Sequence, residues 1–151
     1  MAAPEPEGGA KPPPQRHFPG RGTIQIAGEK GPLIAVEVAR TSEERSHGLM
    51  FRTALAPDAG MIFEMPRDQQ WGFYMRNTLI PLDMIFIDRD WRVVGIVANA
   101  PPLTEETRQV DGESRFVLEL AAHRAAQLHL AAGTQLLFTR LPDQPAPTAA
   151  P

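Results

Sequence analysis

Short apolar runs with a period of two, separated by turn residues, restrict the fold of this chain more than any other feature. Ile24 and Ile26 alternate with polar residues, and the alternation resumes over residues 33–39 after a turn at 27–32. A period of two places apolar side chains on one face of a strand, so these two runs predict a β-hairpin.

Similar runs continue along the chain and predict more strands. They fall at residues 60–65, 71–76, 84–87, 92–97, 116–120 and 135–140. Asp88, Arg89 and Asp90 form the predicted turn between two of these strands. Alternation also predicts that Trp71 and Phe73 share one face of their strand.

Two helices are expected among the strands. Thr41 and Glu44 have the spacing of a capping box, which predicts a short helix ending near Gly48 and followed by inward-facing residues 49–51. Residues 121–132 are good helix formers that end before Gly133. Many strands, two helices and no regular βαβ alternation favour an α+β fold, with a small, mostly antiparallel, barrel-like sheet and two short flanking helices.

The 151 residues suffice for one domain, and the distribution of proline marks its limits. Residues 1–22 and 142–151 are rich in proline and poor in bulky apolar side chains, so we expect a disordered linker and a disordered tail. The predicted domain is residues 23–141. Residues 98–115 form a long polar connection, which indicates either a lid or a loose hairpin excursion.

The composition argues against several classes of function. A net charge of −3 disfavours non-specific binding to nucleic acids and to anionic membranes. The absence of cysteine excludes disulfides and thiol chemistry, and no apolar run is long enough for a transmembrane helix. The four histidines lack metal-binding spacing, so neither a metal nor another cofactor is expected. The start of the chain shows no signal peptide, which leaves open a cytoplasmic protein or an exported one whose signal was removed.

A long pattern in the middle of the chain is more specific. It consists of Glu44, Arg45, Gly48, Leu49, Met50 and Arg52, then Gly60, Met61 and Phe63, then Phe73, Met75, Asn77, Thr78, Pro81, Leu82, Asp83, Phe86, Ile87 and Asp88, and later Leu118 and Glu119. This pattern resembles the bacterial and archaeal family called domain of unknown function 192 (DUF192) over about residues 33–138. Tyr74, Arg76 and His123 stand where that family usually has Trp, Lys and Gly.

The resemblance implies a small β-barrel with flanking helices and supplies no activity. Because members of the family are often exported or lipid-anchored, it also implies the periplasm or the cell envelope, with the cytoplasm as the alternative.

Eight residues are candidates for a ligand-binding site: Arg45, Arg52, Phe73, Met75, Asn77, Thr78, Asp83 and Glu119. Arg45 and Arg52 are seven residues apart, so they would share a face if the helix reached that far, and with Arg76 they could bind a carboxylate or phosphate. The alternative is that each arginine pairs with a structural carboxylate.

The other candidates also have two interpretations. Asp83 and Glu119 interrupt apolar runs and could be general bases or a carboxylate dyad, or they could be hydrogen-bonded structural groups. Asn77 and Thr78 could bind a ligand or stabilise a turn. Phe73 and the methionines, Met75 among them, could line a cleft or fill the core.

Three functions remain open from the sequence. The leading hypothesis is a non-enzymatic module of the cell envelope that binds a small molecule or a peptide. The second is a hydrolase that uses Asp83 or Glu119 as its general base, and the third is a protein-interaction domain without a small ligand. Whether the protein is an enzyme, and its oligomeric state, stay open.

Overall fold

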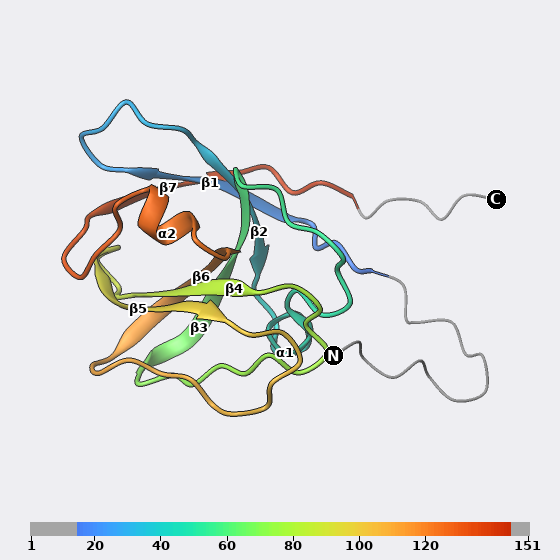
Figure 1. The fold of residues 1–151 in the computed structure, drawn as a ribbon. Helices are drawn as coiled ribbons and strands as arrows, with labels where there is room; N and C mark the ends of the chain where they lie inside the picture. Colours follow the sequence, from blue (N-terminus) through green and yellow to red (C-terminus); the bar gives the residue numbers. More distant parts are fainter. Residues whose placement is uncertain (1–14, 146–151) are drawn as a thin grey trace, which may run out of the picture.

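A computed structural model describes residues 15–145 as one seven-stranded sheet with two short helices (Figure 1). The strands are β1 (Gly20–Ile26), β2 (Ile34–Ala39), β3 (Ala59–Gln69), β4 (Leu82–Ile87), β5 (Val93–Ala100), β6 (Ser114–Ala121) and β7 (Leu136–Leu141). The helices are α1 (Ser42–His47) and α2 (Arg124–Gln127).

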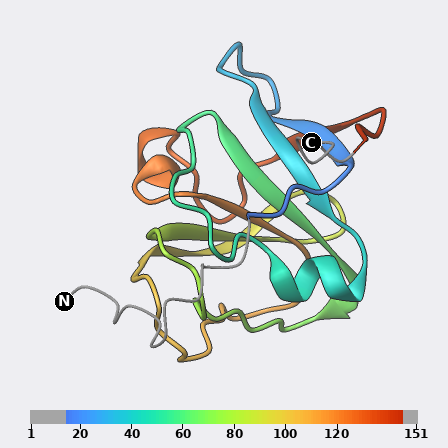
Figure 2. The same cartoon turned by 90° about the vertical axis from the view of Figure 1, so that its right-hand side faces the viewer.

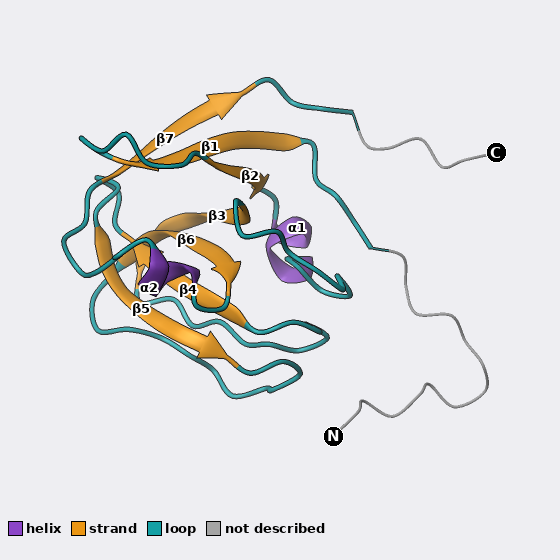
Figure 3. Ribbon diagram, turned by 45° about the horizontal axis from the view of Figure 1, so that its top comes forward, coloured by secondary structure: helices purple, strands orange, loops and turns teal. Residues whose placement is uncertain are grey.

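The sheet is mixed and has the strand order β5-β4-β6-β3-β2-β1-β7. Only β2 and β3 pair in parallel, and α1 lies in the connection between them. The other neighbours are antiparallel, as expected, and they include the predicted hairpin of β1 and β2. The sheet curves, as Figure 3 shows, but it is not closed into a barrel, so the prediction of a barrel-like sheet is confirmed only in part. Its edges β5 and β7 are linked near their beginnings by a single bridge between Arg92 and Gln135.

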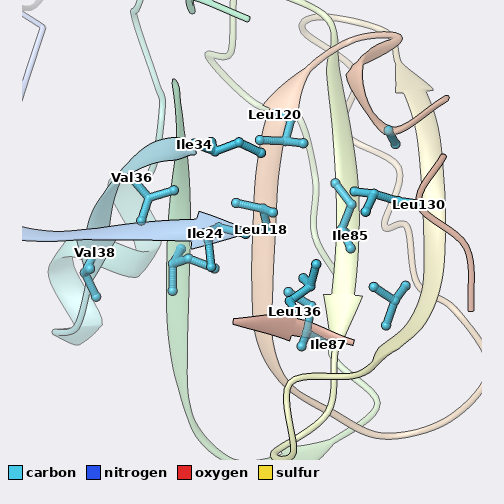
Figure 4. Packing of buried hydrophobic residues seen from close by; sticks show 13 residues of the cluster. Ile24, Ile34, Val36, Val38, Ile85, Ile87, Leu118, Leu120, Leu130 and Leu136 are labelled. Carbon is cyan, nitrogen blue, oxygen red and sulfur yellow. The ribbon is translucent and has the colours of Figure 1, made fainter. Parts of the chain in front are cut away.

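The two faces of the sheet bury different clusters of side chains. The inner cluster collects aliphatic residues from β1, β2, β3, β4, β6 and β7, such as Ile85 and Leu118 in Figure 4, and α2 packs against it through Ala125. The outer cluster is richer in methionine and phenylalanine and includes Met84 and Phe86 from β4. Since alternate residues of one strand face opposite sides, β4 and β6 contribute to both clusters.

The capping box predicted for α1 is present. The amide of Glu44 donates to the Thr41 hydroxyl at 3.1 Å, and the Glu44 carboxylate accepts from the Thr41 amide at 3.2 Å. The helix ends at Gly48, whose φ of 50° favours glycine. Of the three residues expected to pack inward after it, Leu49 is buried, whereas Met50 and Phe51 are only half-buried.

Two predicted elements differ from the structure. Residues 71–76 do not form a strand and contribute only an isolated bridge between Phe73 and Arg108. The predicted helix at 121–132 is reduced to α2, because β6 runs to Ala121 and His123 is left-handed with a φ of 74°. Glycine reaches that backbone conformation with the least strain, which accounts for the glycine usual at this position in the DUF192 pattern.

The folded chain begins before the predicted boundary at Thr23. Phe18 is only 2% exposed and belongs to the outer cluster, and β1 begins at Gly20. At the other end, Asp143 pairs with Arg40 at 2.7 Å. The rest of the predicted linker and tail, residues 1–14 and 146–151, lies outside the described residues. Within residues 15–145, no helix has the length and apolar character needed to cross a membrane.

Candidate functional site

A concave site lies on the outer face of the sheet, between α1 and residues 65–78. It is a pocket of about 450 Å³. Figure 2 shows α1 close to the end of β3, where one side of the pocket begins. The lining comes from α1 and the turn after it, from β3 and the chain that follows, and from one residue of β6: Arg45, His47, Leu49, Met50, Phe63, Met65, Arg67, Trp71, Phe73, Tyr74, Arg76, Thr78 and Glu119, together with small residues.

Glu119 from β6 lines this pocket and is 4% exposed. Its neighbours in the sheet are Met61 on β3 and Met84 on β4, and both are fully buried. Directly opposite residues project to the same face, so the Glu119 carboxyl lies between two thioether side chains. Burial raises the pKa of Glu119 to about 8. Among residues 15–145, no side chain forms a hydrogen bond or ion pair with this carboxyl, so it reaches the pocket without a protein partner.

Arg45 from α1 lines the same pocket as Glu119, and its guanidinium is held by the backbone. Its Nη1 donates to the carbonyl oxygens of Arg40 at 2.7 Å and Glu64 at 3.1 Å. Two neutral carbonyls fix the orientation of the guanidinium and leave its positive charge uncompensated.

Two more arginines line the pocket, each stacked on an aromatic ring. The Arg67 guanidinium lies 5.2 Å from the centre of the Trp71 ring, and the Arg76 guanidinium lies 5.4 Å from the centre of the Tyr74 ring. Arg76 also donates to Glu105 at 3.0 Å. Such cation–π contacts place flat apolar surfaces next to positive charge.

Phe73 and Thr78 belong to the pocket as well. The Phe73 ring packs edge-on against Phe63 at 5.0 Å and Phe86 at 6.0 Å between ring centres, so it joins the pocket wall to the outer cluster. The buried Thr78 hydroxyl donates to the Arg76 carbonyl at 3.2 Å, which is the turn-stabilising role weighed in the sequence.

His47 is the other titratable side chain of α1 in the lining. Its Nε2 is buried without a hydrogen-bond partner within the described chain. Burial lowers the pKa of His47, and the nearby charges of Arg16 and Arg52 lower it further. Over residues 15–145, no group of three or more His, Asp or Glu side chains is placed to hold a metal ion.

The structure places Arg52 away from the pocket, in a buried ion pair. Its guanidinium makes two hydrogen bonds to Glu37 of β2, at 2.6 and 2.9 Å, and one to the Arg16 carbonyl at 2.7 Å. Glu37 also accepts from the amide of Phe18 at 2.7 Å. Burial alone would raise the pKa of Glu37, but the bonds from Arg52 and Phe18 outweigh it and the pKa is lowered. Arg45 and Arg52 do not share a helical face, because α1 ends at His47.

Asp83 also lies outside the pocket and is 1% exposed. Its two oxygens accept the amides of Asn99 and Ala125, both at 2.8 Å, so it anchors α2 to the sheet. Its opposite neighbour on β6 is Leu120, whereas Glu119 is opposite Met84. Asp83 and Glu119 therefore project to opposite faces, and the predicted dyad is not formed.

Met75, Asn77 and the connection at residues 98–115 do not line the pocket. Met75 is fully buried, and Asn77 is an exposed left-handed residue whose carbonyl accepts the amide of Phe51 at 2.8 Å. The connection at 98–115 contributes nothing to the pocket lining. It is pinned to residues 70–78 by backbone hydrogen bonds, among them Met75 to Thr104 at 2.9 Å.

Four of the eight candidates thus meet at one pocket: Arg45, Phe73, Thr78 and Glu119. The sequence reasoning did not include Arg67, Tyr74 and Met50 in the site. No local pattern marks Arg67, because β3 extends beyond the apolar run that predicted it. In the predicted strand, alternation would place Tyr74 on the face opposite Phe73. Both residues line the pocket because residues 71–76 are not a strand.

Comparison with known proteins places this fold among bacterial proteins of similar sequence. A crystal structure of a protein of unknown function from Novosphingobium aromaticivorans DSM 12444 is 41% identical, with a TM-score of 0.70 over 78% of this chain and 83% of that one. A protein from Sinorhizobium meliloti 1021, provisionally named a transcription regulator, is 32% identical, with a TM-score of 0.74 over 81% of this chain and 95% of that one.

No curated protein sequence matches the chain. The sequence profile of the DUF192 family (Uncharacterized ACR) matches residues 23–138. The matched segment contains both helices and all of β2 to β6, together with most of β1 and the first residues of β7. This confirms the resemblance found in the sequence, and the chain belongs to the DUF192 family.

Proposed function

We propose that this protein is a binding module that holds a small ligand in the pocket between α1 and residues 65–78. The observation that carries the proposal is the unpartnered carboxyl of Glu119. This carboxyl belongs to a residue that is 4% exposed and lines the pocket. A ligand in the pocket would supply the missing partner, and the aromatic lining would cover its apolar part.

The test is a thermal-shift screen of the whole chain with sugars, short peptides, organic acids and phosphorylated metabolites. A ligand that binds only the folded state raises the melting temperature. Tyr74→Ala should abolish the shift produced by a hit, because Tyr74 lines the pocket. Leu137→Ala is the control, since Leu137 is also a large exposed side chain but lies on β7, outside the pocket. The proposal fails if no compound raises the melting temperature or if both variants reduce the shift alike.

A second candidate function is acid–base hydrolysis with Glu119, favoured by its pKa of about 8, which is close to neutral pH. Asp83 is no longer part of this hypothesis, because both its oxygens are occupied by backbone amides. An assay with chromogenic esters and glycosides tests it: turnover lost in Glu119→Gln supports catalysis, and turnover unchanged in that variant excludes this general acid or base.

The proposed location of the module is the cell envelope, because the family resemblance favours export. Fractionation of cells that produce the full-length protein distinguishes the envelope from the cytoplasm. The provisional name of the Sinorhizobium meliloti relative gains no support from this chain, whose net charge is −3 and whose described helices have six and four residues. A protein-interaction domain without a ligand is the conclusion if the screen fails.

A further inference from the structure

We infer that the pocket selects a small organic anion with an aromatic or apolar body, whose charged group meets the arginines while a polar acceptor reaches Glu119. This inference rests on the proposed function and names the ligand class for the same site.

The charge of the pocket is opposite to that of the whole chain. Three arginines, Arg45, Arg67 and Arg76, line it, and Glu119 is the only acidic residue among the lining residues. The whole protein has a net charge of −3. A concave site that gathers positive charge in an acidic protein attracts anions selectively.

The arginines are held so that their charge stays available. Arg45 is fixed by backbone carbonyls, and Arg67 donates its Nε to the neutral side chain of Gln69 at 2.8 Å. Neither forms an ion pair within residues 15–145, whereas Arg76 does so with Glu105. Two of the three guanidiniums can therefore bind an anionic group of a ligand without first breaking an ion pair.

The apolar part of the ligand follows from the stacked arginines. The rings of Trp71 and Tyr74 lie next to the Arg67 and Arg76 guanidiniums, and Met50 lines the same pocket. An anion that also carries a ring or a short apolar chain would pair its charge with a guanidinium and cover these surfaces. A purely inorganic anion would leave them in contact with water.

Glu119 distinguishes an anionic ligand from a cationic one. Since its raised pKa keeps the proton on at neutral pH, the carboxyl can donate a hydrogen bond to a ligand and adds no negative charge. The other charged or titratable side chains of the lining are Arg45 and His47 from α1, and Arg67, Tyr74 and Arg76 from β3 and the chain after it. A cationic ligand would need an ionised Glu119 and would be repelled by the three arginines.

The experiment is a fluorescence titration of the whole chain with two matched probes at pH 6.5. The anionic probe is 8-anilinonaphthalene-1-sulfonate, and the neutral probe is N-phenyl-1-naphthylamine, which has the same ring system without the sulfonate. We expect the anionic probe to bind about tenfold more tightly or better, and its affinity to fall with added salt. Arg67→Gln should weaken the anionic probe several-fold and leave the neutral one unchanged. Arg89→Gln is the control, because Arg89 is exposed on the turn between β4 and β5, outside this pocket.

Glu119→Gln tests the role of the Glu119 proton in binding, because glutamine keeps a hydrogen-bond donor at every pH. From pH 6.5 to pH 9 we expect the wild-type affinity for the anionic probe to fall about tenfold, as Glu119 loses its proton, and the affinity of the variant to stay constant. A parallel fall in both proteins would overturn the role of Glu119.

The outcomes separate this inference from the proposed function. If the neutral probe binds as tightly as the anionic one and both are lost in Tyr74→Ala, the pocket binds ligands but the anion selectivity is wrong. If neither probe binds, the inferred ligand class is wrong, and the thermal-shift screen decides separately whether the pocket binds another kind of ligand. If Arg89→Gln weakens the anionic probe as much as Arg67→Gln does, the preference for anions comes from the overall surface charge and not from the pocket. This result would overturn the inference.

Discussion

Asp83 and Glu119 are both buried in neighbouring strands of one sheet, yet their surroundings differ in every respect. Asp83 faces the inner side, where two backbone amides saturate its carboxylate. Glu119 faces the outer side between Met61 and Met84, where no protein group binds its carboxyl within the described chain. A satisfied buried acid stabilises the fold, whereas an unsatisfied one weakens it and is retained where another molecule can bind it. The comparison assigns a structural role to Asp83, and Glu119 is the acid on which the proposed binding function rests.

The strongest test of this assignment is Asp83→Ala. It leaves the amides of Asn99 and Ala125 unsatisfied, and hydrogen bonds to a charged group contribute about 1.5–3 kcal/mol each, so the free energy of unfolding should fall by about 3–6 kcal/mol. Urea denaturation measures it. Asp83→Asn keeps one acceptor oxygen and should lose about half as much. A loss below about 1 kcal/mol would contradict the structural role of Asp83.

Arg52→Ala extends the comparison to a buried cation that has its partner. Removing one member of a buried ion pair typically lowers the free energy of unfolding by about 3–5 kcal/mol, since Glu37 would remain buried alone. Binding in the pocket should persist, because Arg52 is not part of its lining. Denaturation and probe titration together check this. Loss of binding with unchanged stability would show that Arg52 contributes to ligand binding and not to the stability of the fold.

Glu119→Gln should raise the free energy of unfolding, whereas Asp83→Ala and Arg52→Ala lower it. The size of this gain should depend on pH. The folded-state pKa of about 8 lies above the ordinary value of 4.5, so between these values the folded protein keeps a proton that the unfolded chain releases. The wild type therefore loses stability as the pH rises through this window, and the variant does not lose it. At about 1.4 kcal/mol per pH unit, the variant should gain about 3 kcal/mol relative to wild type from pH 4.5 to pH 7, and up to about 5 kcal/mol by pH 9.

Urea denaturation of both proteins from pH 4.5 to pH 9 gives this difference directly. Glu113→Gln is the control, because Glu113 is exposed at the start of β6 and should follow the wild-type curve. Equal pH dependence in wild type and Glu119→Gln would show that the Glu119 carboxyl is not held in its neutral form.

The smallest stability effect belongs to a pocket arginine. The pair of Arg76 and Glu105 is solvent-exposed, with side chains 55% and 66% accessible, and such pairs contribute about 0–1 kcal/mol. Arg76→Gln should therefore change the free energy of unfolding by less than about 1 kcal/mol while it weakens the anionic probe. Calorimetry checks the first and fluorescence titration the second. A larger loss of stability would make Arg76 a structural residue, as Asp83 is.

Local sequence rules were sufficient for most of the strands and for α1. The alternation at 33–39 and the capping box of Thr41 act between near neighbours in the chain, and both are present as predicted. The rules were wrong at 71–76 and 121–132, where apolar content and helix propensity are overruled by partners distant in sequence. Phe73 bridges to Arg108, and Asp83 anchors Ala125. Sheet curvature also depends on all strands together, so the prediction of a barrel-like sheet did not show that the sheet stays open.

The sequence by itself determined the family, a mostly β fold with two short helices, and the presence of two acidic residues in apolar runs. Only the tertiary structure decided which of them is free to bind, because the direction of each side chain depends on the register of β4 against β6. A shift of one residue in β4 would turn Asp83 to the face that holds Glu119. The pocket likewise joins Arg45, Arg67 and Glu119, which lie on three separate elements and meet only through folding.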